Sequence, residues 1–344
     1  MVGNTVLKKP FKPSGKIGIP RNTIDRRFSV APMMDWSDRH CRMFWRCLSK
    51  HAYLYTEMVT TGAILHGDSG HHLQHSPREY PLALQLGGND PVALAKCSQL
   101  AESMGYQEVN LNVGCPSDRV KNGSFGACLM AEPELVRDCM SAMIEQCNIP
   151  ITIKHRIGID DNDSYNALSA FVSTVADSGC TTFIVHARKA ILQGLSPKQN
   201  REIPPLQYDT VYQLKKDFPH LEIIINGGIE DCDAAAKHLQ SVDGAMLGRA
   251  AYHNPQILLD VDSQIYGNGN EAIDVLTALK QYYGYIQDQL DQGEPLNRMG
   301  RHILGAFKGT PGAKQFRRYL SENMHHKNAG LEVIDFACTL IEDQ

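Results

Sequence analysis

The sequence contains no long apolar run. Of its 344 residues 42% are hydrophobic, but no segment reaches the about 18 consecutive apolar residues that a membrane-spanning helix needs. The first 27 residues are polar and basic and include no apolar core, which a secretory signal would require. We therefore expect residues 1–27 to form a flexible N-terminal tail, and the protein to be cytoplasmic with no membrane partner.

Closely spaced cysteine pairs are also missing. The chain has 10 cysteines but no Cys-x-x-Cys, which argues against a zinc ribbon or a thioredoxin-like redox centre. Histidines gather in HGDSGHHLQH (residues 66–75), but no adjoining strand supplies carboxylate or thiolate ligands. We expect no metal site.

The net charge of −4 does not by itself attract nucleic acid, but the charge is unevenly distributed. Between Leu296 and Lys327 the only acidic residue is Glu322. The basic residues of this segment are Arg298, Arg301, Lys308, Lys314, Arg317, Arg318 and Lys327. Such a local excess indicates a polyanion-binding surface, and the alternative is a solvated helix face.

Short β-branched and apolar segments recur along the first part of the chain and alternate with helical patterns. They are Phe28–Met33, Tyr53–Val59, Leu82–Gly87, Glu108–Val113, Ile151–Ile157, Thr182–Arg188, Glu222–Asn226 and Gly244–Gly248. Alternating strands and helices predict parallel βα units, and eight of them predict a closed (β/α)8 TIM barrel. A doubly wound dinucleotide fold would need Gly-x-Gly-x-x-Gly after the first strand, which here ends in Ala-Pro-Met-Met.

No strand pattern follows residue 271. Helical periodicity predicts helices over Ala272–Leu290, His302–Phe307, Gly312–Asn323 and Leu331–Ile341. We therefore expect a barrel over residues 28–268, followed by a small C-terminal helical domain over residues 269–344 that carries the basic cluster.

Polar residues interrupt the apolar strands near their C-terminal ends, where such barrels build their active sites. These residues and the turn residues beside them are Pro32, Met33, Met34, Gln85, Asn112, Cys115, Lys154, Arg156, His186, Asn226, Gly227, Gly228, Gly248 and Arg249. Polar groups in buried strands are costly unless they are paired or used. Their position at one end of most strands predicts a ligand site.

The last two strands indicate what the ligand carries. Gly227-Gly228 and Gly248-Arg249 follow strands seven and eight, where this fold usually holds a phosphate. With a phosphate there, Lys154, Gln85 and His186 would face a flat heteroaromatic group such as that of FMN. A second interpretation makes Lys154 the Schiff-base nucleophile of an aldolase on a phosphorylated substrate, with its pKa lowered by burial and by Arg156.

Several motifs together resemble one family. APMMDWSDRH, YTEMVTTGAIL, QLGGNDP, NLNVGCPSDRVKNGSFGACLM, IKHRIGIDD and INGGI occur in this order between Phe28 and Asn323. They resemble the tRNA-dihydrouridine synthases, and within that family the bacterial A-type enzymes. The resemblance implies FMN-dependent reduction of the uridine C5–C6 bond in the tRNA D-loop at positions 20 and 20a, with NADPH as reductant.

The resemblance also implies residue roles. Cys115 would give a proton to C5 after hydride from FMN N5 reaches C6. Pro32, Met33, Met34, Gln85, Lys154, His186, Asn226, Gly227, Gly228, Gly248 and Arg249 would bind FMN. The target base or the tRNA would contact Asn112, Arg156, Lys198, Arg201, Lys314 and Arg317. We expect a monomer whose partner is tRNA, and the alternatives are the aldolase and a non-catalytic RNA-binding barrel.

Overall fold

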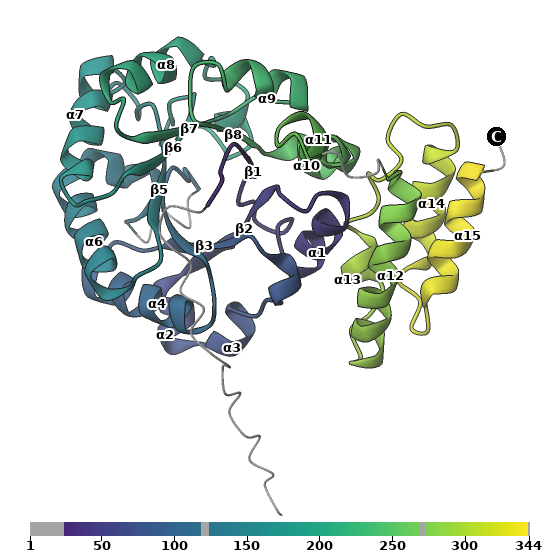
Figure 1. Ribbon diagram of the computed structural model, residues 1–344. Helices are drawn as coiled ribbons and strands as arrows, with labels where there is room; N and C mark the ends of the chain where they lie inside the picture. The colour runs from purple at the N-terminus through teal and green to yellow at the C-terminus, as the bar shows by residue number, and fades with distance from the viewer. Residues whose placement is uncertain (1–23, 118–123, 269–272, 343–344) are drawn as a thin grey trace, which may run out of the picture.

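A computed structural model describes residues 24–117, 124–268 and 273–342. Eight parallel strands close into a barrel in chain order, so the predicted TIM barrel is confirmed (Figure 1). The strands are β1 (Phe28–Val30), β2 (Tyr53–Thr60), β3 (Leu82–Gly87), β4 (Glu108–Val113), β5 (Ile151–Arg156), β6 (Thr182–His186), β7 (Glu222–Asn226) and β8 (Gly244–Leu247). The barrel closes where β1 pairs with β8, with Phe28 opposite Ala245.

Helices in the segments that follow the strands surround the barrel (Figure 1). They are α1 (Arg39–Leu48), α2 (Thr61–His66), α3 (Ser69–His72), α4 (Pro91–Ser103), α6 (Pro133–Gln146), α7 (Tyr165–Ala176), α8 (Tyr208–Asp217), α9 (Cys232–His238), α10 (Arg249–His253) and α11 (Val261–Gln264). Local sequence explains their starts. Asp38 caps α1 by accepting from the backbone N–H groups of His40 and Cys41, and Asp90 caps α4 just before Pro91.

The strands divide their side chains between two apolar regions. Alternate residues face outward and pack under the helices, as Leu54 and Val185 do. The others fill the barrel interior. This interior group consists of Ala31, Tyr53, Tyr55, Ala83, Ile184, Ile224 and Met246. The barrel is therefore a packed core, and a ligand has to bind at its end.

The end of the barrel where the strands begin is closed by Arg26. Its side chain is 5% exposed and forms ion pairs with Glu108 at 2.7 Å and Glu222 at 2.9 Å. Residues 24–27, which we assigned to the N-terminal tail, thus contact the barrel. The ion pairs explain this, because a buried guanidinium needs carboxylate partners that only the folded barrel provides. Residues 1–23 lie outside the described residues.

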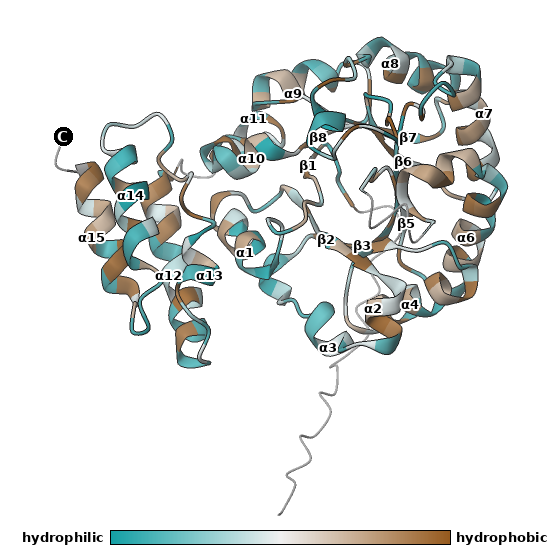
Figure 2. Ribbon diagram, turned by 180° about the vertical axis from the view of Figure 1, so that it is seen from behind, coloured by the Kyte–Doolittle hydropathy of each residue, from teal (hydrophilic) through white to brown (hydrophobic). Residues whose placement is uncertain are grey.

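A group of helices lies beside the barrel, with α12 against α1 (Figure 1). They are α12 (Val275–Asp291), α13 (Asn297–Gly300), α14 (Ala313–Asn323) and α15 (Leu331–Glu342). Figure 2 shows hydrophobic residues interspersed with polar ones along α12, α14 and α15, and buried residues such as Leu279, Phe316 and Ile334 hold these helices together. In the described part of the chain, no helix is long and apolar enough to cross a membrane.

The predicted helix over His302–Phe307 is wrong, because this segment forms turns and the nearby helix is α13. A Cβ on Gly305 would lie 2.9 Å from the carbonyl oxygen of His253. The segment therefore packs tightly against the end of α10. Its apolar spacing reflects this tertiary contact and not helical periodicity.

Candidate active site

A cavity of about 1610 Å³ opens at the C-terminal ends of the strands. Every residue predicted to bind FMN lines it, and so do Asn112, Cys115, Arg156 and Arg201. Pockets for one small molecule usually measure about 300–1,000 Å³. This cavity is large enough for a cofactor together with part of a substrate.

The residues predicted to bind FMN or tRNA differ in their exposure and in whether they line the cavity. Met34 is 51% exposed, at the outer edge of the cavity. Lys198, Lys314 and Arg317 are exposed and do not line the cavity. Any role of these three cations is therefore at the protein surface.

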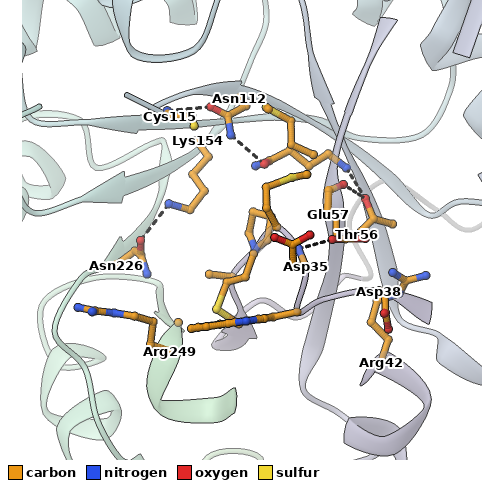
Figure 3. Close-up of a pocket in the computed structure, with 18 of the residues that line it drawn as sticks. Asp35, Asp38, Arg42, Thr56, Glu57, Asn112, Cys115, Lys154, Asn226 and Arg249 are labelled. Atoms are coloured by element: carbon orange, nitrogen blue, oxygen red, sulfur yellow. Dashed lines mark hydrogen bonds between the residues drawn. The ribbon is translucent and has the colours of Figure 1, made fainter. Parts of the chain in front are cut away.

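A row of amides forms one wall of the cavity. Gln85 Nε2 donates to Asn110 Oδ1, and Asn112 Nδ2 donates to Gln85 Oε1, each at 2.8 Å. The Asn112 Oδ1 atom accepts from the backbone N–H groups of Cys115 at 3.0 Å and Gly114 at 3.1 Å (Figure 3). Asn112 thus holds the turn that presents Cys115, and its predicted contact with the target base stays a prediction.

The two cysteines of this loop lie in different environments. Cys115 lines the cavity, and its carbonyl oxygen accepts from the Ala127 N–H at 2.9 Å. Its Sγ lies 3.5 Å from Ser117 Oγ. Cys128 does not line the cavity, and its thiol donates to the Phe125 carbonyl at 3.0 Å. Of these two cysteines, Cys115 is therefore the one placed to meet a ligand in the cavity.

Lys154 crosses the cavity toward β7. Its Nζ donates to Asn226 Oδ1 at 2.9 Å, and Asn226 Nδ2 donates to the Met246 carbonyl at 2.8 Å (Figure 3). Two effects lower the pKa of Lys154 to about 7: burial, which is the larger, and the nearby Arg156 cation. Its amine can therefore gain or lose a proton near neutral pH.

His186 faces the same region as a neutral ring. Burial, followed by the cations of Arg156 and Lys154, lowers the pKa of His186 well below its usual value. The ring packs directly on the backbone of Gly227, where a Cβ would lie 2.6 Å from His186 Cδ2. Gly227 also has a φ of +116°, which side chains rarely allow. Only glycine satisfies both conditions.

The ends of β7 and β8 fit a phosphate group. A Cβ on Gly248 would meet only Ala31 Cβ, at 4.0 Å, so the backbone there is open, whereas the side chains of Leu206 and Tyr208 fill the corresponding space beside Gly228. Gly248 precedes α10, and Arg249 adds a cation at the cavity wall, in a partly exposed ion pair with Glu202. Bare backbone with an adjacent cation suits an anion. The residues present thus fit the phosphate of FMN.

Arg156 is 3% exposed and is bound mainly by the protein itself. Its Nε donates to the Gly114 carbonyl at 2.9 Å, and its Nη1 donates to the carbonyls of Lys189 at 2.9 Å and Asn200 at 3.0 Å. Burial lowers the pKa of Arg156 to about 10, so it stays cationic at neutral pH. It joins the Cys115 turn to the loop after β6.

Glu57 on β2 is a cavity residue that the sequence analysis missed. Its carboxylate accepts from the backbone N–H of Asp35, which has a φ of +65° (Figure 3). Burial raises the pKa of Glu57. The polar pair Thr56-Glu57 within the apolar run YLYTEMV is the signal for it in the sequence.

The histidines of residues 66–75 lie on and after α2 and α3. Within residues 24–117, 124–268 and 273–342, no three His, Cys, Asp or Glu side chains are grouped so that they could hold a metal ion.

Known proteins match this chain over most of its length. The family model described as "Dihydrouridine synthase (Dus)" matches residues 29–341. The chain belongs to the dihydrouridine synthase family. A tRNA-dihydrouridine(20/20a) synthase from Escherichia coli strain K12 is 58% identical to this dihydrouridine synthase over 319 residues, which cover 92% of each chain. One from Pasteurella multocida is 57% identical over 315 residues, covering 92% of this chain and 96% of the relative.

The fold of this dihydrouridine synthase also resembles a solved 2-naphthoyl-CoA reductase complex. The TM-score is 0.54 at 8% sequence identity, over 68% of this chain and 49% of the other. At that identity the likeness concerns the fold alone. Membership of the dihydrouridine synthases decides against the aldolase and the non-catalytic barrel, because the family consists of oxidoreductases.

Proposed function

We propose that this dihydrouridine synthase reduces uridine in the tRNA D-loop at positions 20 and 20a, with FMN as cofactor and NADPH as reductant. The names of the Escherichia coli and Pasteurella multocida relatives both include positions 20 and 20a. The observation that carries the proposal is the Cys115 thiol on the wall of a cavity whose glycine turns fit a flavin phosphate.

Different residues around the cavity would bind different parts of the cofactor. The turns at Gly227-Gly228 and Gly248-Arg249 would hold the phosphate of FMN. Lys154, Gln85 and His186 would face its ring system, and the segment 32–34 would lie beside it. When bound, FMN supplies the hydride for uracil C6 after it has taken electrons from NADPH.

Cys115 would hold a proton on Sγ and donate it to C5 of the base, which completes the saturation of the C5–C6 bond. Asn112 orients the backbone of the Cys115 turn, and Arg156 fixes that turn to the loop after β6. Lys154 can carry either an amine or an ammonium group near neutral pH. It would supply positive charge where the ring of the bound cofactor becomes electron-rich.

Exposed cations would position the tRNA. The proposed set is Lys198, Arg201, Lys314 and Arg317. None of them forms an ion pair with another described residue, so their charge is available to phosphate groups. The target uridine must leave its stack to reach the cavity, as enzymes that modify a base require. A monomeric state and a cytoplasmic location stay predictions.

The test compares two variants, Cys115→Ala and Cys128→Ala, in separate half-reactions. Cys115→Ala should bind flavin and oxidise NADPH as the wild type does, because its thiol takes no part in those steps. Its formation of dihydrouridine in a tRNA transcript should fall by about 10²–10⁴-fold, the size of a lost general acid. Cys128→Ala should keep both activities. Dihydrouridine formation at the wild-type rate by Cys115→Ala would remove the central assignment.

A further inference from the structure

A stacked aromatic pair lies at the edge of the cavity and has no part in the steps above. The rings of Trp36 and Tyr252 are parallel within 7°, with their centroids 4.5 Å apart. His253 meets Trp36 edge-on at 4.9 Å. Trp36 follows β1 and the other two belong to α10 after β8, so barrel closure brings them together.

The pair is held rigidly from the side of the helical domain. The hydroxyl of Tyr252 is hydrogen-bonded to His302 Nδ1 at 3.2 Å. His302 is buried, and its Nε2 lies 3.0 Å from Asp38 Oδ2. Trp36 is fixed by the turn in which the Ser37 N–H donates to the Met33 carbonyl at 2.9 Å. An aromatic ring held in this way loses little freedom when a ligand stacks on it.

The indole is open to the cavity. Trp36 and His253 line the cavity but Tyr252 does not. The tyrosine ring therefore stacks on the face of Trp36 that points away from the cavity. Among the described residues, nothing accepts a hydrogen bond from Trp36 Nε1. The partial exposure and free N–H of Trp36 are those of a binding surface and not of a residue buried for packing.

One cation from the barrel and one from the helical domain lie near this surface. Arg249 from the barrel and Lys308 from the helical domain are both close enough to His253 to interact with it electrostatically. Lys308 has no ion-pair partner within the described ranges. Aromatic faces with cations alongside are typical of sites for unpaired nucleotides. Cations that continue from the cavity onto a second domain suit an RNA strand better than a dinucleotide cofactor.

We propose that Trp36, backed by Tyr252, is a stacking platform for the unpaired base next to the uridine that is being reduced. This rests on the proposed function. Positions 20 and 20a are adjacent, so when one uridine enters the cavity its neighbour is also drawn from the loop and needs a surface. The platform lies on the β1–β8 side of the same opening and provides one.

The experiment uses the full-length flavin-loaded enzyme and two tRNA transcripts. Each transcript has one target uridine, and the adjoining position carries either uridine or an abasic site. With the uridine neighbour, Trp36→Ala should lower kcat/KM for tRNA by about 5- to 150-fold, the usual range for losing one stacked base. Trp36→Phe should recover most of this loss. Flavin absorbance and the rate of NADPH oxidation should not change.

The abasic transcript separates stacking from structural damage. Wild-type enzyme should lose a similar factor on it, and Trp36→Ala should then lose nothing more, because the two changes remove the same contact. The matched control is Phe336→Ala, since Phe336 is 50% exposed on α15 and does not line the cavity. It should keep the wild-type kcat/KM on both transcripts.

Multiplicative losses from Trp36→Ala and the abasic site would overturn the proposal, as would an equal fall in NADPH oxidation. An abasic neighbour that costs the wild type nothing would overturn it without any variant. A wild-type enzyme that forms no dihydrouridine would contradict the proposed function instead, so the two failures are distinct.

Discussion

Arg156 shows how one buried side chain can organise a cavity. Its Nε and Nη1 donate to three backbone carbonyls, one in the Cys115 turn and two in the loop after β6. A guanidinium presents several donors in a rigid fork, whereas an ammonium cannot span the same acceptors. The geometry of the Cys115 turn therefore depends on Arg156 through hydrogen bonds and not through charge alone.

Arg156→Lys keeps the charge and loses the fork. Each carbonyl left without a donor should cost about 1–3 kcal/mol of unfolding free energy. Dihydrouridine formation should fall at least about tenfold, because a small misplacement of a reacting group is costly. Urea unfolding and a single-turnover assay measure the two effects. Arg137→Lys on the surface of α6 is the control and should match the wild type. A fully active and stable Arg156→Lys would show that charge alone suffices.

Lys154 predicts a pH dependence of stability for the flavin-free protein. Its pKa is about 7 when folded and near 10.5 when unfolded, so between these values the unfolded chain binds the extra proton. Stability should then rise with pH in this window, by at most about 1.4 kcal/mol per pH unit from this group. Urea unfolding at pH 7, 8 and 9 measures the slope, which Lys154→Met should reduce. Equal slopes for both proteins would contradict the lowered pKa.

At the scale of elements, the turns after β7 and β8 use glycine for different reasons. Gly227 combines a φ of +116° with close contact to His186. Gly248 has a negative φ, and a Cβ there would meet only Ala31 Cβ, at 4.0 Å. Backbone geometry thus requires glycine at one turn, while at the other the space beside the backbone is open, as the proposed phosphate site needs.

Alanine at these two positions should separate stability from binding. Gly227→Ala should lower the unfolding free energy by about 1–3 kcal/mol through backbone strain, with further loss from the contact with His186. Gly248→Ala should unfold like the wild type, although its Cβ borders the proposed phosphate site. Thermal unfolding and flavin content measure the two effects. Equal destabilisation by both variants would refute the distinction.

For the whole molecule, the contact between α1 and the helical domain fixes the position of the residues proposed to bind tRNA. Tyr282 and Tyr285 on α12 both bond to His40, and Arg301 pairs with Asp38, the cap of α1. These contacts hold the cationic face of α14 in a defined position relative to the cavity. The proposed phosphate contacts on α14 would therefore determine which nucleotide reaches Cys115.

Charge reversal on α14 tests this arrangement. Lys314→Glu with Arg317→Glu should weaken tRNA binding and flatten its dependence on salt, because fewer counterions are released. Binding at several salt concentrations measures this, and NADPH oxidation should not change. Lys96→Glu, at an exposed position of α4, is the matched control. If that control weakened binding equally, α14 would have no special role.

The strands could be predicted because runs of β-branched and apolar residues indicate a strand from local sequence alone. The proposed cofactor residues could be predicted because they stand at or just after the C-terminal ends of these strands. Arg26 and the segment His302–Phe307 were misread because distant partners decide their structure: Glu108 and Glu222 for the first, and the end of α10 for the second. Glu57 was visible in the sequence, but nothing local distinguished a cavity carboxylate from a solvated one.

The sequence by itself determined the eight strands, the loop with Cys115 and the membership of the dihydrouridine synthases, because short-range patterns and motifs carry that information. Only the tertiary structure decided which side chains meet. Closure between β1 and β8 stacks Trp36 on Tyr252, and Arg156 on β5 bonds to both the Cys115 turn and the loop after β6. Such contacts depend on the pairing of segments far apart in the chain, and no local pattern encodes that pairing.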